Sequence, residues 1–182
     1  MKITVKTGLI FALLWIAVKL SMYWFGMVDS QIPGTLINIL CLLLTISVGL
    51  FLSKLRNKEK TSALDDIKSS MTAGLPYTLI VSGFIYFFYA NIDADFTNHK
   101  ISERMALNEK GVNDPKTWAT YKKNHSEYET YSPEQYLEEE KLKIEAANNP
   151  KSIFIISLLG GLMMGAFYSI LVTAIYRKIV FR

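Results

Sequence analysis

Few side chains in this sequence are of types that could do acid–base or metal chemistry. The two histidines, His99 and His125, share one polar segment, but no H-E-x-x-H, G-x-S-x-G or Walker A motif accompanies them. The adjacent residues Glu138, Glu139 and Glu140 would point in different directions on a helix, which favours a solvated face over a cation site. We therefore predict no catalytic residues, no metal ligands and no cofactor, and we expect a protein that is not an enzyme.

Lys19 is a charged residue within a long apolar segment. Burial of its ammonium at the centre of a bilayer would cost about 3 kcal/mol, so its presence needs an explanation. Lys19 could line an ion or substrate path, with Asn38, Tyr86 and Tyr89 as polar neighbours on other helices. Alternatively, its aliphatic stem lets the ammonium reach the headgroups. The segments that we expect to span the membrane contain no Asp or Glu, so we expect no buried carboxylate partner.

Small residues recur every four positions on the last apolar segment, at Gly161, Gly165, Ser169 and Thr173. Such a face allows another helix to approach closely, which is how helices associate when lipid removes the hydrophobic drive. We predict a helix-packing surface. Its partner could be another helix of the same chain or a second copy of the protein.

These residues must be positioned by membrane helices, because the sequence separates its apolar and charged residues. The 182-residue chain is 51% hydrophobic and 20% charged, and almost all charges lie between or outside long apolar runs. A helix needs roughly 20 apolar residues to cross about 30 Å of hydrocarbon. The predicted fold class is an all-α membrane protein with four transmembrane helices, at about 7–28, 33–53, 75–92 and 152–176.

The distribution of basic residues predicts the orientation of these helices. The two chain ends and the link after the second span together hold ten basic and three acidic residues. The stretch at 93–150, between the third and fourth spans, holds eight basic and twelve acidic residues. The positive-inside rule therefore places both termini in the cytoplasm. We expect the chain to be a multi-pass protein of the inner membrane. The net charge of +4 belongs to this topology, so we expect the lipid bilayer as a partner and no nucleic acid.

The link at 54–74 is predicted to be cytoplasmic and partly helical. Leu64, Ile67 and Met71 recur at helical spacing within Ser62–Ala73, with charged residues between them. This pattern is typical of an amphipathic helix that lies in the membrane interface and leads into the third span. A docking site for a cytoplasmic partner is the alternative.

The segment at 93–151 is predicted to be an extracytoplasmic helical insert. Asp114 before Pro115 resembles an N-cap, and Ser132 with Gln135 matches a capping box. Together with Asp95–Asn108, these signals predict three short helices. Large apolar residues are few, so we expect the insert to fold against the membrane face or another protein rather than around its own core.

The chain resembles a family of uncharacterised membrane proteins, common in Bacteroidota, filed as a domain of unknown function (number 4199). The resemblance lies in the start at Lys2–Gly8, the segment Leu64–Gly74 and the exit from the third span at Tyr86–Asp93. A glutamate-rich segment then precedes a glycine-containing last helix that ends at Tyr176–Lys178. The resemblance implies a bacterial inner-membrane location and the same four-span plan. It implies no functional residues.

Two functions are consistent with these features. The first is a non-enzymatic accessory or assembly subunit that binds a membrane-protein partner, or another copy of itself, through its insert and its small-residue face. The second is an oligomeric small transporter or channel subunit that uses Lys19 and the polar residues near it.

Overall fold

In the computed structural model, the residues described are 2–27, 31–56 and 61–180, and they form helices and no strands. Some of the predicted features lie outside the described residues. They are the end of the first span at Val28, the start of the turn that follows it, part of the link, and Arg182. The α-helices of the described chain are α1 Ile3–Trp24, α2 Gln31–Arg56, α3 Ala63–Phe87, α4 Phe96–Asn113, α5 Pro115–Asn124, α6 Pro133–Asn148 and α7 Pro150–Ile175. The described chain also contains two short π-helical segments, η1 Phe88–Ile92 and η3 Tyr176–Val180, and one 3₁₀-helical turn, η2 Ser126–Tyr128.

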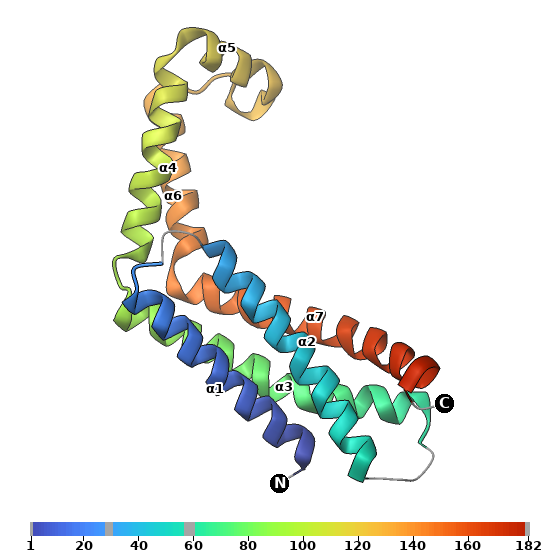
Figure 1. Cartoon of the computed structure of the whole chain (residues 1–182). Helices are drawn as coiled ribbons and strands as arrows, with labels where there is room; N and C mark the ends of the chain where they lie inside the picture. The colour runs from blue at the N-terminus through green and yellow to red at the C-terminus, as the bar shows by residue number, and fades with distance from the viewer. Residues whose placement is uncertain (1, 28–30, 57–60, 181–182) are drawn as a thin grey trace. The chain divides into compact units, whose positions relative to one another are not determined.

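Four helices of the described chain are long and apolar enough to cross a membrane: α1, α2, α3 with η1, and α7 with η3 (Figure 1). The prediction of an all-helical protein with four such helices is confirmed. Many of their apolar side chains point away from the protein, as on α7, where Met163 is 75% exposed and Phe167 is 59% exposed. An apolar exterior of this kind suits contact with lipid.

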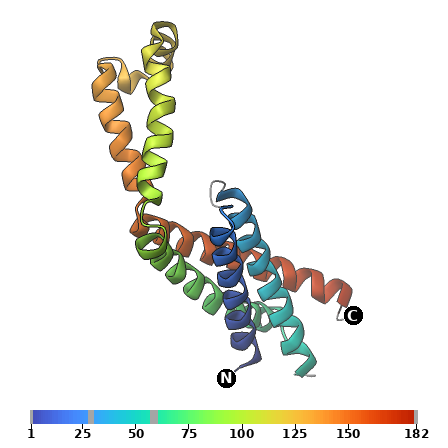
Figure 2. The same cartoon turned by 60° about the vertical axis from the view of Figure 1, so that its left-hand side comes forward.

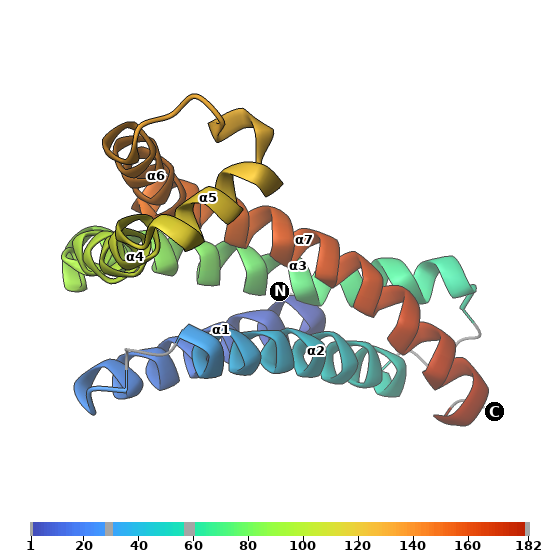
Figure 3. The ribbon, with the colours of Figure 1, turned by 90° about the horizontal axis from the view of Figure 1, so that it is seen from above.

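The chain divides into two compact units. The first, which we call the bundle unit, comprises Met1–Phe84 and Ile155–Arg182. The second, which we call the insert unit, comprises Ile85–Phe154 and contains the segment predicted as the insert at 93–151. Within the bundle unit, α1 and α2 lie side by side (Figure 3).

Helix α3 is the packing centre of the bundle unit, because a glycine on each of three other helices faces it. A Cβ added to Gly8 of α1 would collide with the carbonyl oxygen of Ala73. A Cβ added to Gly49 of α2 would lie 2.5 Å from the Cβ of Ala73, and one added to Gly161 of α7 would lie 2.6 Å from Cγ2 of Thr78. These glycines therefore let α1, α2 and α7 approach α3 more closely than larger residues would.

Most of the segment Ser62–Ala73 belongs to α3, which is one continuous helix from Ala63 to Phe87. This segment therefore continues into the third apolar span without a break, and its place in the membrane interface stays a prediction. Its buried side carries Asp66, Ser70 and Ala73, whereas Leu64 is 59% exposed. Leu64 thus lies on the outside of the bundle unit, the side that an interfacial helix would turn to lipid, and the small and polar residues face the other helices.

The insert unit is a hairpin of α4 and α6, with α5 between them in the chain (Figure 2). The two long helices are antiparallel, since the Thr97 hydroxyl at the start of α4 donates to the carbonyl oxygen of Asn148 at the end of α6, at 2.8 Å. Both predicted helix starts are confirmed. Asp114 accepts from the backbone N–H groups of Lys116 and Thr117, and Ser132 forms a reciprocal capping box with Gln135.

The insert unit also has a small aromatic core, contrary to the expectation that it would lack one. Val112, Tyr128 and Tyr136 are buried together, and further apolar and aromatic side chains pack against them. The Lys143 ammonium lies 2.8 Å from the Glu139 carboxylate and donates to the Tyr128 hydroxyl, and these two contacts raise the pKa of Lys143. The ammonium also lies 5.0 Å from the centre of the Tyr128 ring. The expectation failed because the folded insert unit gathers most of its tyrosines into one cluster, where the rings together bury a large apolar area.

The close approach of α1 to α3 predicts the effect of a single methyl group. In Gly8→Ala, the new Cβ meets backbone that cannot rotate away, so we expect the free energy of unfolding to fall by about 1–3 kcal/mol. Gly160→Ala is the matched control, because nothing lies within 4 Å of its added Cβ. Thermal unfolding of both variants in mild detergent checks this, and an equal effect of the two would contradict close packing at Gly8.

Candidate functional site

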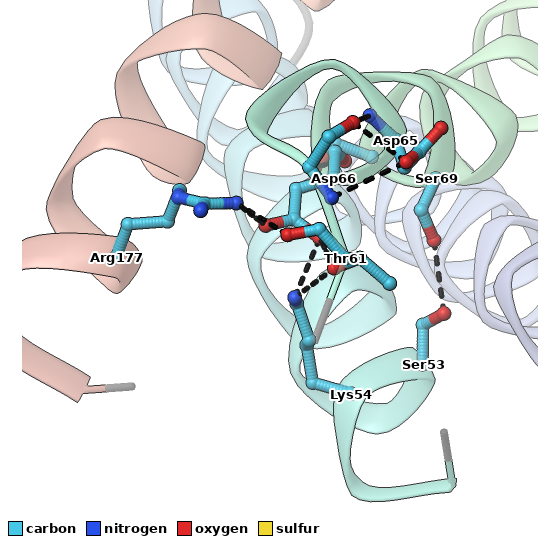
Figure 4. A network of polar contacts seen from close by, with 9 residues as sticks. Ser53, Lys54, Thr61, Asp65, Asp66, Ser69 and Arg177 are labelled. Atoms are coloured by element: carbon cyan, nitrogen blue, oxygen red, sulfur yellow. Dashed lines mark hydrogen bonds and ion pairs between the residues drawn. The ribbon is translucent and has the colours of Figure 1, made fainter. Parts of the chain in front are cut away.

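A buried carboxylate, Asp66, lies in the first turn of α3, where the residue is 2% exposed (Figure 4). It begins the buried side of α3 that continues through Ser70, Ala73 and Tyr77. This spacing of three or four residues keeps one side of a helix turned toward its neighbours. The carboxylate therefore lies at the N-terminal end of α3, where the C-terminal ends of α2 and α7 also lie.

Two basic residues from different helices pair with Asp66. The Lys54 ammonium, at the end of α2, lies 2.7 Å from Oδ1, and the Arg177 guanidinium, just after α7, lies 2.8 Å from Oδ2. The Thr61 hydroxyl donates a further hydrogen bond to Oδ1, at 2.6 Å. Both carboxylate oxygens are therefore satisfied by partners, as an ionised group removed from water requires.

The charges of this group also match the dipoles of the helices that carry them. Asp66 lies near the N-terminus of α3, whose partial charge is positive. Lys54 lies in the last turn of α2, and Arg177 follows α7, where the partial charge is negative. The ion pairs and the helix dipoles therefore both stabilise the meeting of these three helix ends.

Further hydrogen bonds tie the link to the same helix ends. Arg177 donates to the carbonyl oxygen of Thr61 at 3.0 Å, and Lys54 donates to the Thr61 hydroxyl. Ser69 of α3 donates to Ser53 of α2 at 2.9 Å. Thr61, Asp66 and these basic residues therefore form a network that joins α2, α3 and α7 at one end of the bundle unit (Figure 4).

A cavity of about 570 Å³ lies at this same end of the bundle unit. Its walls come from the start of α1, the end of α2 and the start of α3. The lining contains three basic side chains, Lys2, Arg56 and Lys68, with Asp65, Ile3 and four hydroxyl-bearing residues. Ser53 and Ser69, which bond each other, belong to this lining, so the network and the cavity are neighbours.

The four residues predicted as an intramembrane polar site are divided between the two units. In the bundle unit, Lys19 is half-buried on α1, and the Asn38 side chain on α2 accepts a hydrogen bond from the Tyr77 hydroxyl at 2.6 Å. In the insert unit, the Tyr86 ring lies 6.2 Å from that of Phe154. The Tyr89 ring lies 4.4 Å from that of Phe96. Asn38 therefore joins α2 to α3, and each tyrosine packs against another aromatic ring.

The predicted small-residue face of α7 lies largely within the bundle unit. Gly161 packs against Thr78 of α3, while Gly165, Ser169 and Thr173 are buried. The Ser169 hydroxyl donates to the carbonyl oxygen of Gly165 at 2.7 Å. Because the chain itself covers this face, it does not offer a free surface to a second copy.

Asp66 was not singled out in the sequence, because the third span was predicted to begin only at about residue 75. The helix α3 with η1 is long and apolar enough to cross a membrane and includes both Asp65 and Asp66. The signal that could have found Asp66 is the run of small or polar residues at 66, 70 and 73, which marks the inner side of a membrane helix.

Removal of the Asp66 charge leaves two basic groups without their shared partner. We expect Asp66→Asn to lower the free energy of unfolding by roughly 3 kcal/mol, because a buried ion pair that loses one member is strongly destabilised. Asp65→Asn is the matched control, since Asp65 is exposed and bonds Ser62 at the start of the helix. Thermal unfolding in mild detergent compares them, and an equal loss in both variants would rule out a special role for Asp66.

Comparison with known proteins bears on the whole chain rather than on this site. The chain matches no curated protein and no solved structure. One family model, described as "Protein of unknown function (DUF4199)", matches residues 6–178, which include the insert unit and nearly all of the four apolar helices. The chain therefore belongs to this family, as its resemblance in sequence predicted.

Proposed function

We propose that this chain is a non-enzymatic accessory or assembly subunit of a bacterial inner membrane, which binds a protein partner through its insert unit. The bundle unit anchors the chain in the bilayer. The observation that carries the proposal is the insert unit itself, a polar helical hairpin with its own core that still leaves large apolar side chains in contact with solvent.

The proposed orientation places both ends of the chain and the link in the cytoplasm. The start of α1, the end of α2, the start of α3 and the end of α7 gather at one end of the bundle unit (Figure 1). These ends and the link carry ten basic residues, whereas the insert has an excess of acidic ones. The positive-inside rule supports this arrangement, with the insert unit on the extracytoplasmic side.

The insert unit supplies the proposed partner surface. Leu107 on α4 and Leu142 on α6 are each 61% exposed, whereas the aromatic side chains of the core are buried. Contiguous exposed apolar surface outside the membrane is typical of protein contacts, and in the proposal these two leucines belong to such a surface. The small-residue face of α7 contributes packing inside the chain instead, so we assign partner binding to the insert unit alone.

The alternative function is an oligomeric small transporter or channel subunit. It would use Lys19 with Asn38, Tyr86 and Tyr89, of which Asn38 bonds Tyr77 and the two tyrosines pack against aromatic rings. These contacts account for the three neighbours as packing residues. We therefore favour the accessory role.

The proposed orientation predicts which reporter cysteines react from outside the cell. We expect Lys110→Cys, in the insert unit, to react with a membrane-impermeant maleimide in spheroplasts. We expect Ser62→Cys, at the start of α3, to react only after lysis. The unmodified chain is the control, because its own thiol, Cys41, is buried. The reverse labelling pattern would contradict the orientation.

The partner surface predicts the composition of complexes taken from native membranes. Tagged protein extracted in mild detergent should carry a stoichiometric protein partner, and the double variant Leu107→Ser with Leu142→Ser should lose it. The control is Ala106→Ser with Ala147→Ser, which changes two other exposed residues of the same helices. A complex that survives the leucine variant would refute the insert surface. A monomer or homo-oligomer in the wild type would instead support the transport alternative.

A further inference from the structure

The basic residues of the Asp66 network are paired with a carboxylate, whereas in the described part of the chain those that line the cavity beside it are not. Lys54 and Arg177 share the Asp66 carboxylate within 2.8 Å. By contrast, none of the ion pairs among the described residues involves Lys2, Arg56 or Lys68, the three basic residues that line the cavity. With one carboxylate in the lining, the cavity carries a net charge of +2.

The carboxylate in the lining, Asp65, is engaged elsewhere. Its Oδ2 accepts from the Ser62 hydroxyl at 2.6 Å and from the Ser62 backbone N–H at 3.2 Å. The Asp65 N–H in turn donates to the Ser62 hydroxyl at 3.1 Å. This reciprocal arrangement caps the start of α3 and holds the carboxylate at its own helix end, where it also feels the charge of Lys68 without forming a close ion pair with it.

The lining also offers neutral hydrogen-bond donors. Ser53 and Ser69 share a single hydrogen bond of 2.9 Å, so one of the two hydroxyl hydrogens is not used in that bond. The first turn of α1 contributes Ile3 and Thr4, and Lys2 provides no side-chain cap to this helix start. No acidic residue lies in that turn, so its backbone N–H groups and positive dipole end favour an anion.

We infer that this cavity binds a phosphate group, carried either by the headgroup of an anionic phospholipid or by a soluble phosphate ester. Arginine and lysine supply charge-assisted hydrogen bonds to phosphate oxygens, and the hydroxyl groups and the start of α1 supply neutral donors. The volume of about 570 Å³ lies within the usual range for small-ligand sites, roughly 300–1,000 Å³.

The place of the cavity in the fold favours the lipid as the source of the phosphate. It lies where the ends of three membrane helices meet, the level at which headgroups lie if the bundle unit spans the bilayer as proposed. Basic pockets between such helices on the cytoplasmic side are known to hold anionic headgroups. The phosphate chemistry itself does not depend on the proposed partner binding, since the insert unit takes no part in it.

The test measures ligand binding to the purified full-length protein in neutral detergent. The probes are phosphatidylglycerol, diacylglycerol as a lipid without phosphate, and sn-glycerol 3-phosphate as a soluble ester. The cavity variant is Arg56→Gln with Lys68→Gln. Its matched control is Lys6→Gln with Lys178→Gln, which removes the same charge from exposed residues near the same helix ends but outside the cavity lining.

We expect phosphatidylglycerol to bind the wild type and the control variant equally, and the cavity variant at least about tenfold more weakly. Diacylglycerol should bind none of them in this selective way. Binding of sn-glycerol 3-phosphate with the same sensitivity, in the absence of selective lipid binding, would identify a soluble ester as the ligand. Equal weakening by both variants, or binding of neither phosphate probe, would overturn the inference.

Two measurements separate loss of the site from loss of the fold. Thermal unfolding of the cavity variant without ligand should match that of the wild type, because both substituted side chains are exposed. Lys68→Arg, which keeps the charge, should retain binding of the phosphate probe within about threefold. Loss of binding in Lys68→Arg equal to that in the cavity variant would contradict a role for the charge.

Discussion

The burial of the Asp66 carboxylate is the constraint on which the arrangement of helix ends depends. A charge removed from water must be paired. Here the partners are Lys54 at the end of α2 and Arg177 in η3. The carboxylate cannot be satisfied unless these segments and the described part of the link meet at one place. The same meeting brings the start of α3 against the ends of its neighbours and forms one wall of the cavity beside it.

Away from that end, the bundle unit is held by close packing around α3. In lipid, apolar side chains gain little by turning inward, so the interior goes to residues that permit contact or bond each other. Gly8, Gly49 and Gly161 provide the contact, and Tyr77 with Asn38 provides a hydrogen bond between α3 and α2. Some large apolar residues also fill this interior, as Ile46 and Leu50 do, whereas many others lie on the outside, as Met163 does.

The two units divide the proposed work of the protein. The bundle unit holds the ion-pair network and the basic cavity, both of which depend on several membrane helices. The insert unit is organised by its own antiparallel helices, its caps and its cluster of aromatic rings. A partner surface on the insert unit and a phosphate site on the bundle unit can therefore be altered separately by substitution.

The sequence by itself determined the features that depend on neighbouring residues or on length. These are the four long apolar helices, the polar helical insert, and the helix starts at Asp114 and Ser132, because a cap bonds backbone only two or three residues away. Only the tertiary structure decided which side of α3 is buried and what Asp66 binds. Its partner Arg177 is 111 residues distant in the chain, and the local pattern around Asp66 is equally compatible with an exposed interfacial helix. The cavity likewise collects residues from three helix ends, so no single stretch of sequence encodes it.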